Sequence, residues 1–245
     1  MRSLRNLLLF VSVFVVHAAQ ALDAPPELIP ADLSPGDQFY IVFAGSDTLD
    51  GAQSSAAYAA YAATVKANNL ITDSIAGWTT LFGHDDSTLV TTSAFGSNTA
   101  QPVYNTNGDR VADNMGNFFS DSQVNAVGYD ESGVATSANI WTGFNFTGSS
   151  TGIGDDSLGG NDSLNDGCLA GNAGQTNSQW ATSVLVGGAG CAGVSLGLYV
   201  LSPLLTVPGA LAVPVANHYA LGVTALLLIA LAGWARKRTS SSRRA

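Results

Sequence analysis

Basic side chains are scarce in this sequence, and its long middle stretch has almost none. Of the 245 residues, nine are Lys or Arg and 18 are Asp or Glu, so that 11% carry a charge, against about 25% in an ordinary soluble domain. Lys66 and Arg110 are the two basic residues between Arg5 and Arg236. All 18 acidic residues lie in that stretch, which has two positive charges against 18 negative ones and a net charge of −16. Such a body repels phosphate backbones, so nucleic-acid binding is excluded, and the composition is unusual for a cytoplasmic enzyme.

Histidine and cysteine are also rare, which limits the chemistry available to the chain. Of three histidines, His17 lies in the N-terminal apolar segment and His218 beside the C-terminal one, which leaves His84 for the body. The H-E-x-x-H spacing of zinc proteases and the C-x-x-C pair of metal and redox sites are absent from the sequence. No period recurs along the chain, which argues against solenoids and propellers.

The first 21 residues have the order of a secretory signal peptide. Arg2 and Arg5 precede an apolar run of ten residues from Leu7 to Val16, and the small-residue triplet Ala19-Gln20-Ala21 follows. This order predicts export and cleavage after Ala21. The alternative is an uncleaved N-terminal anchor, for which ten apolar residues are few.

The C-terminal end contains the longest uncharged apolar segment of the chain. Tyr219 to Ala235 spans 17 residues without a charge, and a helix of that length extends roughly 26 Å at about 1.5 Å per residue. Tyr219 and Trp234 border it, where aromatic rings favour the headgroup level, and Arg236-Lys237-Arg238 follows. The pattern predicts a transmembrane helix with a basic tail in the cytoplasm and the acidic body outside. A buried core helix is the alternative.

The segment that leads into this helix resembles a bacterial sorting signal. Val213-Pro214, then Tyr219, the apolar helix and the basic cluster Arg236, Lys237 and Arg238 stand in the order of the tripartite C-terminal signals of Gram-negative bacteria. The resemblance is to the kind named for an Ile-Pro-Thr-Leu motif, which is related to the Pro-Glu-Pro kind. It implies an exosortase-like membrane protease as a partner, which would remove the helix and deliver the body to the cell surface or extracellular matrix. Without that cleavage the helix stays as an anchor.

Between the two ends the sequence predicts one mixed α+β domain. Prolines mark residues 22–37 as an extended lead-in, and β-forming residues predict a strand over 38–43. Tyr58, Tyr61 and Val65 give the run from Ala52 to Asn69 one apolar helical face. Asn107-Gly108 predicts a hairpin, and Gly, Ser, Asn and Asp predict long loops, the longest over 148–178. Further short strands are expected near 78–82, 103–104, 140–146 and 194–201.

The order of motifs in this body resembles a bacterial extracellular domain family of unknown function with a C-type-lectin-like or endostatin-like fold. The resemblance spans Phe39 to Leu201. It is carried by the strand Phe39–Phe43, the helix start at Gly51-Ala52, Trp78, the Gly108-to-Asn114 hairpin, Ile140-Trp141-Thr142-Gly143, Cys168, Trp180, Cys191 and Leu198-Tyr199. The Glu-Pro-Asn and Trp-Asn-Asp triplets with which lectins of this fold hold calcium and sugar are absent, so the resemblance does not carry that sugar site.

The two cysteines, Cys168 and Cys191, predict a disulfide. An exported chain meets an oxidising environment in which such bonds persist. Closing a loop of about 24 residues stabilises the folded state by roughly 3 kcal/mol in the chain-entropy estimate. Two free or metal-bound thiols are the alternative.

Candidate chemistry in the body is limited to one histidine and one acidic loop. His84 stands beside Asp85 and Asp86, and we expect a solvated loop histidine, with pairing to a distant serine as the alternative. Calcium is the one cofactor that the sequence suggests, because hard oxygen ligands abound in the loop over 155–167. The candidate ligands are Asp155, Asp156, Asp162 and Asp166. The same residue types are required by turns, so a turn-rich loop without metal is the default expectation.

These observations combine into one predicted organisation. The expected fold is an α+β, C-type-lectin-like domain, with one main helix, short antiparallel strands and long loops, plus one C-terminal transmembrane helix. The expected segments are a signal peptide over 1–21, a lead-in over 22–37, the ectodomain over 38–203, a linker over 204–218, the membrane helix over 219–235 and the tail over 236–245.

The predicted function is that of an exported binding or structural protein, not an enzyme, on the surface or in the matrix of a Gram-negative bacterium. Recognition of a partner such as a surface polysaccharide is expected from the loops over 148–178. The alternative is an exported hydrolase that uses carboxylates, or a serine with His84.

Overall fold

The computed structural model describes residues 21–149, 157–159, 167–186 and 191–209. Contacts divide the chain into two units, Met1–Val207 and Pro208–Ala245. The described part of the first unit is a mixed α+β domain with much sheet and few helices, which confirms the predicted class. In the ranges just given, no helix is long and apolar enough to cross a membrane. The helix predicted over Tyr219–Ala235 lies outside them.

The elements are short, apart from two seven-residue strands and one helix of eleven residues. The strands are β1 (Leu22–Asp23), β2 (Gln38–Ala44), β3 (Leu49–Asp50), β4 (Thr79–Gly83), β5 (Leu89–Val90), β6 (Val103–Asn105), β7 (Arg110–Ala112), β8 (Asn139–Trp141), β9 (Cys168–Asn172), β10 (Val184–Val186), β11 (Ser195–Leu201) and β12 (Leu205–Thr206). The α-helices are α1 (Ser55–Val65), α2 (Leu70–Asp73) and α3 (Met115–Phe118), and the 3₁₀ turns are Pro26–Leu28, Lys66–Asn68, Thr92–Phe95 and Ser178–Trp180.

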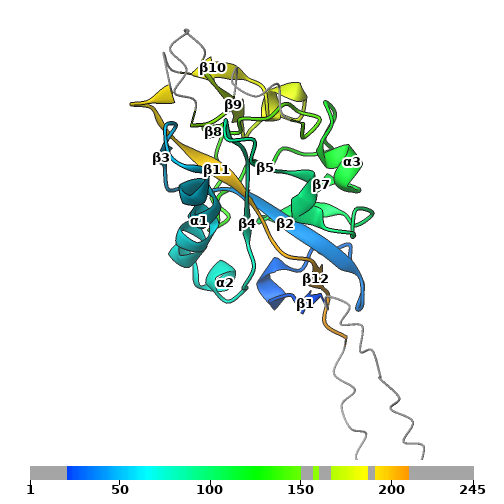
Figure 1. Ribbon diagram of the computed structural model, residues 1–245. Coiled ribbons are helices and arrows are strands. Elements are labelled where there is room, and N and C mark those ends of the chain that lie inside the picture. Colours follow the sequence, from blue (N-terminus) through cyan, green and yellow to red (C-terminus); the bar gives the residue numbers. More distant parts are fainter. Residues whose placement is uncertain (1–20, 150–156, 160–166, 187–190, 210–245) are drawn as a thin grey trace, which may run out of the picture. The chain divides into compact units, whose positions relative to one another are not determined.

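Strand β11 is the centre of the sheet (Figure 1). The main path runs β1-β12-β2-β11-β8-β9-β10, and β3 and β4 also pair with β11. One edge of β11 pairs antiparallel with β2 and β3, while the other pairs antiparallel with β4 and parallel with β8. A single strand therefore holds four segments of the chain in register.

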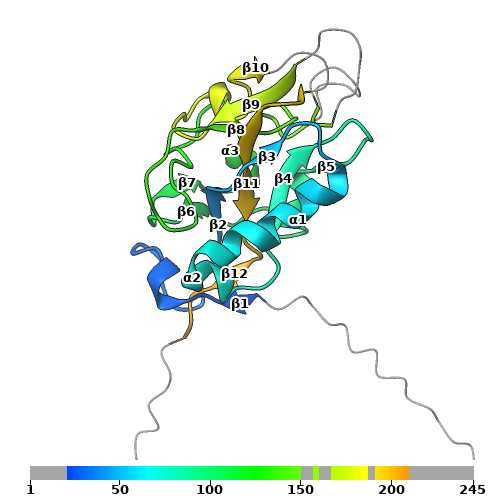
Figure 2. The same cartoon turned by 90° about the vertical axis from the view of Figure 1, so that its left-hand side faces the viewer.

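The sheet separates two buried layers because its central strands are apolar on both faces. Along β2, Phe39, Ile41 and Phe43 pack with the side chains of α1, while Tyr40 and Val42 pack in the opposite layer. Neighbouring residues of a strand point to opposite faces, so this alternation is the expected one for a fully buried strand. Figure 2 shows α1 lying across one face of the sheet.

Helix α1 begins later than the sequence predicts and ends close to the predicted position. The Ser54 side chain accepts a hydrogen bond from the Ala57 amide at 3.3 Å, and the first helical residue is Ser55 rather than Ala52. The 3₁₀ turn Lys66–Asn68 completes the run, and Asn69 is extended. Tyr58, Tyr61 and Val65 are buried as the spacing predicts.

The domain includes segments on both sides of the predicted range 38–203. Leu22 and Asp23 pair in parallel with Leu205 and Thr206 of β12. The Leu22 amide donates to the Leu204 carbonyl at 3.1 Å. The first residues of the lead-in are therefore part of the sheet, and the sheet continues beyond residue 203 as far as Thr206.

Two strands lie where the sequence predicts loop, and one predicted strand is shorter. β9 and β10 pair with each other, β9 also pairs with β8, and the predicted loop over 148–178 contains β9. The strand expected over 140–146 ends at Trp141. The hairpin predicted at Asn107-Gly108 joins β6 and β7 as expected.

Candidate functional site

The predicted disulfide joins Cys168 at the start of β9 to Cys191, four residues before β11. The two Cα atoms lie 5.6 Å apart, and both residues are 1% exposed. The disulfide confirms the predicted pairing and is consistent with an extracellular or otherwise oxidising environment.

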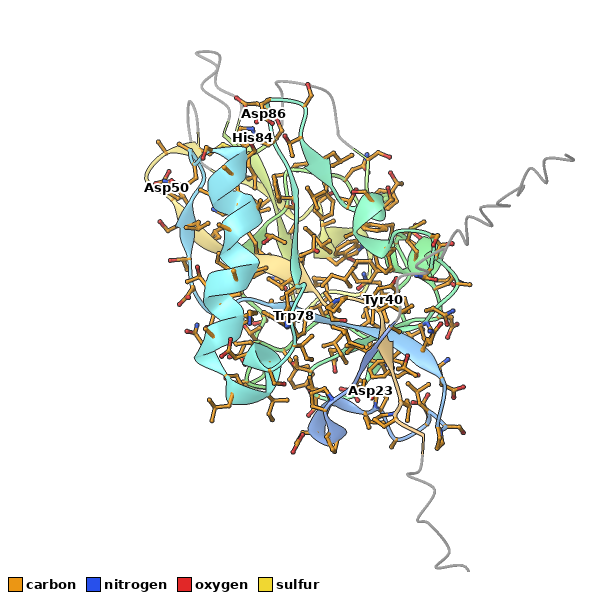
Figure 3. The ribbon with its side chains drawn as sticks, turned by 60° about the horizontal axis from the view of Figure 1, so that its bottom comes forward. Asp23, Tyr40, Asp50, Trp78, His84 and Asp86 are labelled. Atoms are coloured by element: carbon orange, nitrogen blue, oxygen red, sulfur yellow. A yellow bond between two sulfur atoms is a disulfide. The ribbon has the colours of Figure 1, made fainter. Side chains whose placement is uncertain are left out.

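His84 is largely buried, which corrects the expectation of a solvated loop histidine. Its side chain is 8% exposed, and Nε2 lies 3.0 Å from the Gln53 carbonyl oxygen, just before α1. Nδ1 lies 2.7 Å from Asp85 Oδ1 and 3.0 Å from Asp86 Oδ1. Figure 3 shows His84 and Asp86 together near one end of α1. The imidazole thus connects the turn after β4 to the start of the helix.

The surroundings of His84 are those of a structural residue. Hydrogen bonds from the Ser55 hydroxyl and from Thr88 lower the pKa of Asp86 well below its usual range. Within the described ranges, the hydrogen-bond and ion-pair partners of the His84 ring are the Gln53 carbonyl, Asp85 and the backbone and carboxylate of Asp86, and none is a serine hydroxyl. Among the residues that the structure describes, none brings a nucleophilic side chain to the His84 ring.

The remaining predicted site residues lie outside the described residues. These are Asp155, Asp156, Asp162 and Asp166 of the acidic loop, and Val213, Pro214, Tyr219, Arg236, Lys237 and Arg238 of the sorting-like segment. Among the residues that the structure does describe, no three His, Cys, Asp or Glu side chains gather as a metal site would require.

A pocket of about 420 Å³ lies where β11, β8 and the end of β2 meet. Its polar lining consists of Ser46, Thr48, Asp130, Thr136, Asn139 and Ser195. Its apolar lining comes from Ala44, Ala138, Ile140 and Leu196, together with Gly45 and Gly197. We call it the β11 pocket.

The pocket lies where the parallel ladder begins. β8 pairs with β11 from Gly197 onward, while Ser195 and Leu196 pair on their other edge with β3. Gly197 is required here, because a Cβ at this position would overlap the Gly45 carbonyl oxygen. The chain after β2 therefore packs directly against β11, and Ser46 and Thr48 line the pocket.

A buried carboxylate fixes one wall of the β11 pocket. Glu131 is 4% exposed and accepts a hydrogen bond from the Ser46 amide at 3.1 Å, a second from the Ser46 hydroxyl and a third from Asn68 Nδ2 at 3.3 Å. The turn that carries Glu131 is tied to the end of β2, because the Ala44 amide donates to the Tyr129 carbonyl at 2.9 Å. Glu131 is thereby satisfied by neutral donors.

Both basic residues of the body are engaged away from this carboxylate. Lys66 pairs with Asp73 at 2.8 Å, and Arg110 pairs with Asp32 at 2.6 Å and with Asp113 at 2.9 Å. The described lining of the pocket includes Asp130 and no basic side chain. The pocket and its wall are therefore uncharged or negative throughout.

The β11 pocket was not predicted from the sequence, although the sequence has one signal at its lining. Gly193 to Gly197 has the Gly-x-Ser-x-Gly spacing, with Ser195 at its centre. In hydrolases that spacing forms a sharp turn between a strand and a helix. Here Ser195 begins β11 and pairs with Asp50, so the serine is part of a strand and the spacing does not form such a turn.

Comparisons with known protein families, with curated proteins and with solved structures found no match for this chain.

Proposed function

We propose that this chain is an exported bacterial protein, attached to the cell surface or delivered to the extracellular matrix, whose C-type-lectin-like ectodomain acts as a binding or structural component. The observation that carries this proposal is the buried Cys168–Cys191 disulfide in a strongly acidic body. Disulfides persist in exported proteins and are rare in the cytoplasm.

The positions of the family-like motifs in the fold support the C-type-lectin-like assignment. The opening apolar run is β2, the Trp-Thr-Gly motif begins in β8 and the closing Leu-Tyr lies in β11. The two cysteines connect β9 to the approach of β11. The motifs that carry the resemblance thus lie on the elements that build the centre of the sheet.

The β11 pocket gives the proposed recognition site a more specific location than the loops do. The sequence places recognition in the loops over 148–178, part of which lies outside the described residues. The β11 pocket is formed instead by the segments 44–48, 130–140 and 195–197, and its volume of about 420 Å³ falls in the range of small-molecule sites, roughly 300–1,000 Å³. We therefore assign binding to this pocket.

The experiment that tests the proposal measures the intact mass and the location of the protein in its own host. The wild type is compared with Pro214→Ala, which alters the sorting-like motif, and with Pro208→Ala as the matched control outside that motif. A processed sorting substrate is expected to begin at Leu22, to end near Val213 and to be found outside the inner membrane.

The mass and the location of the protein distinguish three outcomes. Loss of the processed species in Pro214→Ala, but not in the control, supports delivery by an exosortase-like protease. A wild-type species that retains Arg236 to Ala245 and faces the periplasm would refute the processing step and leave a membrane-anchored ectodomain. A reduced protein found in the cytoplasm would overturn the whole proposal.

A further inference from the structure

We propose that the β11 pocket binds a neutral, hydroxyl-rich ligand, namely a unit of an uncharged glycan, and that it does so without calcium. This inference rests on the proposed function and names the ligand class of that site. Its basis is the hydrogen-bonding capacity, charge and apolar surface of the pocket.

The Ser46 hydroxyl is oriented before a ligand arrives. An ionised carboxylate accepts hydrogen bonds and cannot donate them, so the contact with Glu131 uses the Ser46 hydroxyl hydrogen. The Ser46 oxygen accepts a hydrogen bond from Asn68 Nδ2 at 3.5 Å, and its second lone pair offers the pocket an acceptor. Because Glu131 is buried and also holds the Ser46 amide, this orientation is fixed by the backbone as well as the side chain.

The other polar groups of the pocket supply both acceptors and donors. Asp130, which lines the pocket, uses Oδ1 to accept the amides of Ser132 and Val134, each at 2.9 Å, and its second oxygen accepts no hydrogen bond from the described residues. The side-chain oxygen Oδ1 of Asn139 accepts a hydrogen bond from Asn172 Nδ2 at 3.3 Å, which leaves the side-chain nitrogen Nδ2 of Asn139 as a donor. The hydroxyls of Thr48 and Ser195 can act in either role.

This mixture matches a ligand whose groups also donate and accept. A sugar hydroxyl does both, whereas a carboxylate or phosphate only accepts and would face Asp130 with no basic side chain in the lining to neutralise it. The apolar atoms of Leu196 and Ala138, which are partly or fully exposed, provide a surface for the C–H face of a sugar ring. The pocket therefore favours uncharged sugars over uronic acids and sugar phosphates.

The test uses the full-length protein in a detergent that contains no sugar, with EDTA in one series of measurements and calcium in a parallel series. Binding of neutral sugars (glucose, galactose, mannose, N-acetylglucosamine and their short oligomers) is compared with that of glucuronate and galacturonate by saturation-transfer NMR and calorimetry. At least one neutral sugar is expected to bind, and the matching uronate is expected to bind at least tenfold more weakly.

Two variants locate the binding site. Ala138 is exposed and lines the pocket, so Ala138→Phe is expected to lower affinity at least tenfold by filling it. Ala59 is exposed on α1 outside the pocket lining, and Ala59→Phe adds the same aromatic ring there as the matched control. If Ala138→Phe fails to fold by circular dichroism, Thr48→Val removes one hydroxyl at an exposed position and is expected to weaken binding severalfold.

The results separate this inference from the function on which it rests. Absence of neutral-sugar binding at millimolar concentration, equal binding of uronates, loss of binding in EDTA, or binding unaffected by the pocket variants would each overturn the ligand assignment. The export and processing experiment does not depend on the ligand, so an exported protein that binds no sugar would refute this inference alone.

Discussion

Opening the Cys168–Cys191 disulfide is expected to lower the free energy of unfolding by about 3 kcal/mol. The bond closes a loop across a sequence separation of 23 residues. The chain-entropy relation assigns about 3 kcal/mol to a loop of this size, because the bond restricts the unfolded chain. For a domain of this length, that loss corresponds to a fall in melting temperature of roughly 6–12 °C.

Replacing both cysteines by alanine is expected to cost more than reduction. Cys168 and Cys191 are buried in the layer between the sheet and α1, so the double variant also removes two sulfur atoms from the core. If each is comparable to a buried methylene group, the additional loss is about 1.5 kcal/mol, for a total of about 4–5 kcal/mol. The difference between reduction and substitution therefore separates loop closure from packing.

The assay is urea unfolding of the full-length protein, followed by tryptophan fluorescence, with and without reductant. Trp141 is fully buried, and its ring and Cys191 both lie against Gly51. Its emission therefore reports on the region around the disulfide. The alanine double variant is the control for the reductant, which is expected to leave its midpoint unchanged. A loss below about 1 kcal/mol on reduction would refute the loop-closure argument, because the relation predicts three times that value.

Two further predictions concern the helix start and the buried tyrosines. Ser54→Ala removes the N-cap of α1 and is expected to cost about 1 kcal/mol in urea unfolding; an unchanged midpoint would show that the cap does not stabilise the helix. Burial raises the pKa of Tyr58, Tyr61 and Tyr199 above the usual range, and desolvation together with Asp32 raises that of Tyr104 to about 12. Because the folded values exceed the unfolded value of about 10, this stability is complete below pH 10 and is lost as the pH rises through the folded values. Ionisation of these four tyrosines, followed by tyrosinate absorbance, is expected to accompany unfolding, and their ionisation near pH 10 in the folded protein would contradict this.

Local signals in the sequence predicted the elements whose formation depends on neighbouring residues. The apolar run of β2 and the Asn107-Gly108 turn are examples, because a buried strand and a tight hairpin each require specific residue types at adjacent positions. The helix boundary was wrong by three residues, since Ser54 provides a better cap than the residues before it.

The elements that the sequence did not predict depend on distant contacts. β9 contains Gly171, where the Trp180 carbonyl oxygen occupies the space of a Cβ, so the glycine that signals a loop here permits close packing. The β11 pocket was not predicted because Ser46, Glu131 and Ser195 come from segments that only the sheet topology brings together. His84 was expected in solvent because its contact with Gln53 cannot be read from the residues beside it.

The pairing of β1 with β12 determines how the domain would carry a mechanical load. β12 lies between β1 and β2, parallel to the first and antiparallel to the second, and Val207 is held by Gly36 and Asp37 at 2.9 Å each. A load applied at Val207 along β12 would act on its hydrogen bonds to both neighbours together, in shear, instead of opening them one after another. In the surface-attached form that we propose, an attachment through this strand would withstand flow without unravelling the sheet.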